Sequence, residues 1–216
     1  ASSGKTNPVW NTYEQSYTGV ITSANTQYTL NAYMHRKLTL STDPRLNKLW
    51  FAPSSAPGGA LISIKFGTDG DLTVQPNTTV AANYHWVLIS SDAGVDANKQ
   101  KTGSAGATEG TAIFLASESY FLQAEALARG IIISGNASLP TVDQLFRAGI
   151  TASMNACKVA AADQTTYLGN IADITGDNLE TQVRKIIEEK WIGNYFLNHF
   201  ESWCDYRRTG YPDPVA

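Results

Sequence analysis

The chain has 216 residues, which is enough for one large domain or two small ones with a sizeable hydrophobic core. Hydrophobic residues make up 43% of it and charged residues 16%, with a net charge of -3, which is typical of a globular protein and excludes the strongly basic nucleic-acid-binding classes. No window of about 18 apolar residues is present, so we expect no membrane-spanning helix.

The first half of the chain, residues 1–112, is predicted to be rich in loops. Ser, Thr, Asn, Gly and Pro are frequent there, and the apolar runs ALISIKF and HWVLIS are short enough to be strands. One helix is predicted near QYTLNAYMHRKLTL and is expected to end before Pro44, which disfavours helical backbone at Asp43. The run SSDAGVDANKQKTGSAGATEG is nearly free of apolar side chains, which indicates a solvated loop. Its Asp92 and Asp96 resemble part of a calcium loop, but the required spacing is incomplete, so we favour no cation there.

Residues 113–216 are predicted to be helical. The first helix, IFLASESYFLQAEALARG, contains strong helix formers and is expected to end at Gly130. Glu118, Phe121 and Glu125 share one stripe of this helix, at positions i, i+3 and i+7. Two acids beside a phenylalanine predict a partly buried face whose carboxylates need cationic partners.

The second predicted helix lies within LPTVDQLFRAGITASMNAC. Thr141, followed three residues later by Gln144, forms a capping box at its start. Its apolar face is predicted to contain Phe146, Ile150, Met154 and Cys157. Two amphipathic helices joined by a loop form a helical hairpin of the tetratricopeptide type, although no exact 34-residue repeat is visible.

The third predicted helix lies within TGDNLETQVRKIIEEKW, with Asp177 and Glu180 as its capping box and Gly193 ending or bending it. Its core side is predicted to contain Leu179, Val183, Ile187 and Trp191. The same spacing continues through Phe196, Phe200, Trp203 and Arg207. We therefore expect both tryptophans to pack in the core and Arg207 to point toward it.

Two adjacent arginines, Arg207 and Arg208, stand near the end of the chain. A guanidinium on the buried side of a helix is costly unless a carboxylate or carbonyl group pairs with it. Glu118 and Glu125 supply candidate carboxylates, so we hypothesise that Arg207 or Arg208 locks the last helix onto the first helix of the hairpin. Phosphate binding is less favoured, because no Gly-rich loop or further basic cluster accompanies the pair.

The sequence contains no recognisable catalytic or cofactor-binding motif. The three histidines are scattered without HExxH spacing, and no G-x-S-x-G elbow is present. Glu188 and Glu189 are adjacent, so on a helix they point in different directions and cannot flank one glycosidic bond. We predict that the protein is not an enzyme and binds no cofactor. Cys157 and Cys204 lack metal-site spacing, and we favour buried free thiols over a disulfide.

Four segments together resemble one known family. In chain order they are STDPRLNKLWFAP, YFLQAEALARG, LFRAGITASMNA and IIEEKWIGNYFLNHFESWCDYRRTGYP, spanning about Asp43 to Pro212. Their order and the intact RRTGYP are similar to the C-terminal half of SusD/RagB-like outer-membrane nutrient-binding lipoproteins. Family members are typically longer, carry an N-terminal lipidated cysteine and continue beyond RRTGYP, and Phe146 replaces a usual tyrosine. The chain begins ASSGKTNPVW, which is neither a signal peptide nor a lipidation signal, so the sequence indicates either a cytosolic protein or a mature or truncated product. The resemblance implies the second, a fragment trimmed at both ends.

The resemblance implies a mainly α fold. We expect a SusD-like α-α superhelix of tetratricopeptide-like helical hairpins, with long irregular loops and a few short strands. Residues 1–216 are expected to form a single SusD-like domain fragment, with 1–112 as the loop-rich, ligand-facing part and 113–216 as the helical part. The resemblance also implies a protein on the extracellular face of the outer membrane, held by a lipid anchor absent from this chain. It would pass oligosaccharides to a SusC-like TonB-dependent transporter, with no nucleic acid as partner.

Aromatic side chains in loops are the candidate ligand-binding residues, because aromatic rings stack on the apolar faces of sugars. Trp50, Tyr84 and Trp86 lie in the loop-rich half, outside the helical stripes. The alternative for Trp86 is a core position in a buried HWVLIS strand. Two other functions stay open, a RagB-type peptide-binding import protein and a tetratricopeptide-like scaffold for protein partners, and a carbohydrate-active enzyme is a more distant one. A scaffold would show a full set of repeats and few loop aromatics, which is the reverse of this sequence.

Overall fold

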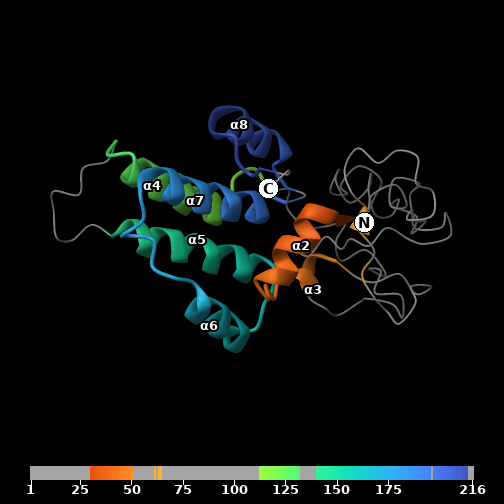
Figure 1. Ribbon diagram of the computed structural model, residues 1–216. Helices are drawn as coiled ribbons and strands as arrows, with labels where there is room; N and C mark the ends of the chain where they lie inside the picture. The colour runs from red at the N-terminus through yellow and green to blue at the C-terminus, as the bar shows by residue number, and fades with distance from the viewer. Residues whose placement is uncertain are drawn as a thin grey trace, which may run out of the picture. The chain divides into compact units, whose positions relative to one another are not determined.

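The computed structural model describes residues 30–50, 61, 63–64, 112–131, 140–195 and 197–213. The chain divides into two compact units, Ala1–Thr111 and Ala112–Ala216. Within the described residues the protein is mainly helical with a single two-stranded sheet, so the predicted fold class is confirmed (Figure 1). That both units form one SusD-like domain stays a prediction.

The described part of the first unit contains a short parallel strand pair, with two helices between its strands in the chain. Strand β1 (Leu30–Asn31) pairs with β2 (Ser63–Ile64), which lies inside the predicted ALISIKF strand. Helix α2 (Ala32–Leu40) begins where the side chain of Asn31 accepts hydrogen bonds from the backbone N–H groups of Tyr33 and Met34, at 2.8 and 3.3 Å. The predicted helix is therefore present, but it starts only after this cap.

The DPRL segment, which follows α2, contains an internal ion pair between Asp43 and Arg45. The side chain of Arg45 donates from Nε to both carboxylate oxygens of Asp43, at 3.0 and 3.1 Å, and from a terminal nitrogen at 2.6 Å. Both side chains are fully buried, so each charge needs the other. The short helix α3 (Leu46–Leu49) follows, and Trp50 ends it.

The second unit is built on three packed helices. Helix α4 (Ala116–Ala128) packs against both α5 (Val142–Ala156) and α7 (Leu179–Gly193), which also contact each other (Figure 1). Helix α6 (Ala161–Asn170) follows α5, and α8 (His199–Thr209) contacts α7. This helix is not predicted from the sequence. Only Tyr167 of α6 is buried, so the segment lacks the apolar periodicity that predicts a helix.

The hairpin of α4 and α5 follows the sequence pattern closely. Glu118, Phe121 and Glu125 are all buried, and Gly130 adopts a φ of 68°, the left-handed conformation that ends many helices. The capping box of α5 is present in both directions: Gln144 donates its N–H to Thr141 Oγ1 at 3.2 Å, and Thr141 donates its N–H to Gln144 Oε1 at 2.8 Å. The predicted apolar face of α5 is also buried, at Phe146, Ile150, Met154 and Cys157.

The start of α7 differs from the prediction. The side chain of Asn178, not that of Asp177, caps the helix by accepting from the N–H of Thr181 at 2.9 Å. Asn178 carries its acceptor oxygen one residue closer to the first turn, and Asp177 pairs instead with Lys185 at 2.7 Å. The buried residues of α7 include Val183 and Ile187 as predicted. Leu179 is exposed and Trp191 half-buried, so those two predicted core positions are wrong.

The prediction that the same stripe continues into α8 is also wrong. Helix α7 ends at Gly193, as expected, and α8 begins only at His199, capped by Asn198. The intervening turn restarts the helix with a different phase, so a spacing of i, i+4, i+7 no longer tracks one face. Phe200 is 71% exposed and Trp203 53% exposed, and Arg207 is also exposed. Phe196 lies outside the described residues.

Candidate functional site

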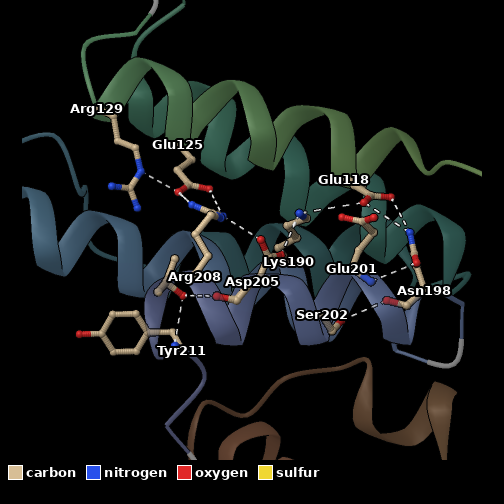
Figure 2. A network of polar contacts seen from close by, with 11 residues as sticks. Glu118, Glu125, Arg129, Lys190, Asn198, Glu201, Ser202, Asp205, Arg208 and Tyr211 are labelled. Atoms are coloured by element: carbon tan, nitrogen blue, oxygen red, sulfur yellow. Dashed lines mark hydrogen bonds and ion pairs between the residues drawn. The ribbon is translucent and has the colours of Figure 1, made fainter.

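An ionic network joins α8 to α4 and α7 (Figure 2). We use this name for the connected side chains of Glu118, Glu125, Arg129, Lys190, Asn198, Asp205 and Arg208. Helical spacing places Glu118 and Glu125 on one side of α4, and Asp205 and Arg208 on one side of α8. The network therefore brings together residues about 80 positions apart in the chain, such as Glu118 and Asn198.

The first part of the network centres on Glu125. Arg208 contacts both of its carboxylate oxygens, with 2.8 Å between one terminal nitrogen and Oε2. Arg129, one turn further along α4, donates from Nε to Oε1 at 2.7 Å. The same terminal nitrogen of Arg208 also lies 2.8 Å from Asp205 Oδ1. Glu125 is thus held between two guanidinium groups, a charge-assisted arrangement with a bidentate partner.

The second part centres on Lys190. Its Nζ lies 2.8 Å from Asp205 Oδ2 and 4.0 Å from Glu118 Oε1, and all three side chains are at least nine-tenths buried. The side-chain amide of Asn198 lies 3.5 Å from each oxygen of Glu118. Asp205 consequently bridges the ammonium of Lys190 and the guanidinium of Arg208, which links the two parts.

The pairing of Glu125 with Arg208 favours the charged form of both groups. Burial alone would raise the pKa of Glu125, but hydrogen bonds from Arg208 and Arg129 outweigh it and hold the pKa below its usual range. The hydrogen bond with Glu125 correspondingly raises the pKa of Arg208. A carboxylate held ionised in this way is a poor proton donor or acceptor near neutral pH. The arrangement suits a structural clamp better than acid–base chemistry.

The two arginines of RRTGYP play different parts. Arg208 contacts Glu125, whereas Arg207 lies exposed with its guanidinium carbon 5.8 Å from the centroid of the Trp203 ring. Arg208 stands three residues after Asp205 on the inner side of α8, and Arg207 points outward. The expectation that Arg207 faces the core is therefore corrected. That the Arg208 contact stabilises the fold stays a prediction.

Sequence reasoning missed Lys190, Asn198 and Asp205. The spacing of Asp205 and Arg208 at i and i+3 was a usable signal, because it places opposite charges side by side on a helix. Lys190 stands three and seven residues after the buried Ile187 and Val183, so a lysine on that row signals a buried cation. Nothing in the sequence indicated that Asn198 would contact Glu118, because its place at the start of α8 is seen only in the structure.

Of the predicted ligand-binding residues, only Trp50 lies among the described residues. Trp50 is 1% exposed, so its ring offers no face to a ligand, and the prediction of a solvent-facing platform there is corrected. It follows α3 directly and is buried as a core residue. Tyr84 and Trp86 lie outside the described residues, as do the HWVLIS run and the loop of Asp92 and Asp96.

Other chemistry-bearing groups are dispersed. Cys157 is buried and Cys204 half-buried, and no disulfide joins them. Within the described ranges no three His, Cys, Asp or Glu side chains are grouped so as to hold a metal ion. None of the described helices is long and apolar enough to span a membrane.

The chain is similar to known SusD-like proteins. The model of the SusD-like_2 family, described as "Starch-binding associating with outer membrane", matches residues 4–215. Crystal structures of SusD homologues from Bacteroides thetaiotaomicron and Bacteroides vulgatus are similar to it, with TM-scores of 0.57 and 0.51 at 19% and 22% identity. These two alignments cover 85% and 84% of this chain, and 38% and 37% of the other chains. A structure named "Bacteroidetes AC2a SusD-like" has a TM-score of 0.53 at 17% identity, covering 85% of this chain and 43% of the other.

The comparison with curated proteins found no match. At these identities the likeness to the solved structures shows the fold. The chain spans 37% to 43% of the length of those three proteins.

Proposed function

The chain belongs to the SusD-like family of starch-binding proteins that associate with the outer membrane, and on this basis we propose that it takes part in capturing oligosaccharides for nutrient uptake. The observation that carries the proposal is the family match over residues 4–215, nearly the whole chain. The helical fold shared with SusD homologues supports it. In this proposal the protein binds its ligand without cleaving it.

The proposal includes a partner and a place in the cell. The captured oligosaccharide passes to a SusC-like TonB-dependent transporter, and a lipid anchor holds the protein at the extracellular face of the outer membrane.

We place the ligand platform in the first unit, at Tyr84 and Trp86. Aromatic rings bury the apolar face of a sugar, while nearby polar groups fix its hydroxyls. Trp50 is not part of this platform, because its ring is buried. The ionic network serves as scaffold in this proposal, because it holds the helices of the second unit together and contains no ring that stacks on a sugar.

The test is a glycan array probed with the full-length protein, including α-glucan oligosaccharides, beside a peptide library. We expect a saccharide affinity that falls about five- to 150-fold in Trp86→Ala or Tyr84→Ala, since loss of one stacking aromatic costs roughly 1–3 kcal/mol. The matched control is Tyr120→Ala, which removes a 38% exposed aromatic ring from α4. Equal loss in the control would contradict the platform assignment. A peptide-only signal would move the protein to the RagB-type alternative.

A second assay addresses cleavage. The same full-length protein is incubated with each bound oligosaccharide, and newly formed reducing ends are measured. We expect none above the buffer background. Protein-dependent release that scales with protein concentration would reject a pure binding function.

A further inference from the structure

The junction between α7 and α8 holds a buried side-chain amide that the protein itself does not satisfy. Asn194 directly follows the last residue of α7 and is 1% exposed. Its backbone is fully used: the N–H donates to the carbonyl of Lys190 at 2.8 Å, and the carbonyl accepts from the N–H groups of Leu197 and Asn198 at 2.9 and 3.0 Å. Neither Oδ1 nor Nδ2 of the side chain has a hydrogen-bond partner among the described residues. Burial of an amide without partners is costly, so both atoms call for a ligand that donates and accepts.

A second buried group at the same junction has only long contacts. Glu118 is 2% exposed, and its carboxylate oxygens each lie 3.5 Å from Nδ2 of Asn198, with Nζ of Lys190 at 4.0 Å from Oε1 (Figure 2). Direct N–H···O bonds are about 2.7–3.2 Å long, so Glu118 has no short hydrogen bond from these groups. Lys190 and Asn198 are also the residues whose backbones bond to Asn194. Two independent observations therefore fall on one turn of the chain.

The chemistry of these groups identifies the ligand. The Glu118 carboxylate and Oδ1 of Asn194 accept hydrogen bonds, whereas the Lys190 ammonium and Nδ2 of Asn194 donate them. A cation would be repelled by Lys190, and an anion would be repelled by Glu118. The ionic network also leaves no charge for an ion to balance, because its acids and its cations are equal in number: Glu118, Glu125 and Asp205 against Arg129, Lys190 and Arg208. Water is the molecule that both donates and accepts without adding charge.

The burial limits the size of the ligand. With Asn194 and Glu118 at 1% and 2% exposure, a saccharide or a peptide does not reach them from the surface. Buried waters in proteins typically make about three hydrogen bonds to polar groups that would otherwise be unsatisfied, and they are costly to remove. The junction supplies such groups on both sides of the turn that leads into α8.

We propose that ordered water is bound at the α7–α8 junction as a permanent part of the fold, hydrogen-bonded to both side-chain atoms of Asn194 and bridging Glu118 to Lys190. The bound water completes the ionic network where direct contacts are long. It also ties the end of α7 to the turn that sets the rotational phase of α8. This inference does not depend on the proposed function, since it concerns groups that no external ligand contacts.

The experiment is a crystal structure of the full-length protein at a resolution that shows ordered water, with long-lived buried waters counted in solution by oxygen-17 magnetic relaxation dispersion. Asn194→Leu replaces the amide by an apolar side chain of similar shape, and Asn170→Leu, at the exposed end of α6, is the matched control. We expect the wild type to show water within about 2.7–3.2 Å of Oδ1 and Nδ2 of Asn194. Asn194→Leu should lose at least one long-lived water, and Asn170→Leu should lose none.

Each outcome decides the inference. Water beside Asn194 in the wild type, with a reduced count of long-lived waters only in Asn194→Leu, supports it. A wild-type structure in which the Asn194 amide bonds directly to protein groups, or has no density beside it, overturns it. A peak with several oxygens at about 2.3–2.6 Å would identify a calcium-like cation and overturn the assignment to water. An unchanged count in a folded Asn194→Leu would also overturn it, and the wild-type structure decides alone if that variant does not fold.

Discussion

Replacing Arg208 and Arg207 separately by glutamine gives a matched pair of variants. The pair tests whether the contact of Arg208 with Glu125 stabilises the fold. The two arginines are neighbours on α8, and glutamine has a helix propensity similar to that of arginine at either position. Arg208→Gln removes the guanidinium that contacts Glu125 and Asp205. Arg207→Gln removes only the exposed cation over the Trp203 ring.

The expected magnitudes differ because the lost contacts differ. A hydrogen bond to a charged group contributes about 1.5–3 kcal/mol, and the 45% exposure of the Arg208 side chain lowers this through solvent screening. Glu125 keeps Arg129, and Asp205 keeps Lys190, so neither carboxylate is left alone. We therefore expect Arg208→Gln to lower the free energy of unfolding by about 1–2 kcal/mol. An exposed cation–π contact contributes about 0.5–1 kcal/mol, the upper limit for Arg207→Gln.

The assay is thermal and urea unfolding of the full-length protein, followed by circular dichroism. For a cooperative unit of about this size, a loss of 1–2 kcal/mol lowers Tm by roughly 2–8 °C. A double-mutant cycle of Arg208→Gln with Glu125→Gln should give a coupling of at least about 0.5 kcal/mol, as for residues in contact. Equal destabilisation by both arginine variants, or a larger effect of Arg207→Gln, would refute the stabilising role of the Arg208–Glu125 contact.

Three further predictions concern the same unit. Lys190→Met leaves the buried Glu118 without a cation, whereas Asp205 keeps Arg208, so we expect a loss of about 3 kcal/mol in urea unfolding, and a loss below about 1 kcal/mol would contradict the buried pairing. Gly149→Ala places a Cβ 2.6 Å from Cε1 of the buried Phe121, and we expect a cost of about 1–3 kcal/mol, with an unchanged Tm counting against this close approach. The lowered pKa of Glu125 contributes stability that is complete above its unfolded pKa of about 4.3 and is lost as the pH falls through the folded value. In acid titrations followed by circular dichroism, Glu125→Gln should therefore flatten the loss of stability below about pH 4, and an unaltered slope would argue against the shift.

The hairpin of α4 and α5 was predictable because each of its signals is local. The capping box needs only Thr141 and Gln144, three residues apart, and Gly130 provides the left-handed backbone at the end of α4. The burial of Glu118 and Glu125 followed from their place on the stripe of Phe121. The start of α7 was less predictable, because Asp177 and Asn178 are both good caps and the sequence does not rank them.

The sequence by itself determined the periodic helices, the need of two α4 acids for cations, and the ordered motifs that place the chain in its family. The tertiary structure decided which cations pair with these acids, because the turn before α8 sets the rotational phase of that helix. That phase sends Asp205 and Arg208 inward and Trp203 and Arg207 outward. It also placed Trp50 in a core position. Spacing along one helix is fixed by its pitch, but the rotation of one helix relative to another depends on the connecting turn and on packing across distant parts of the chain.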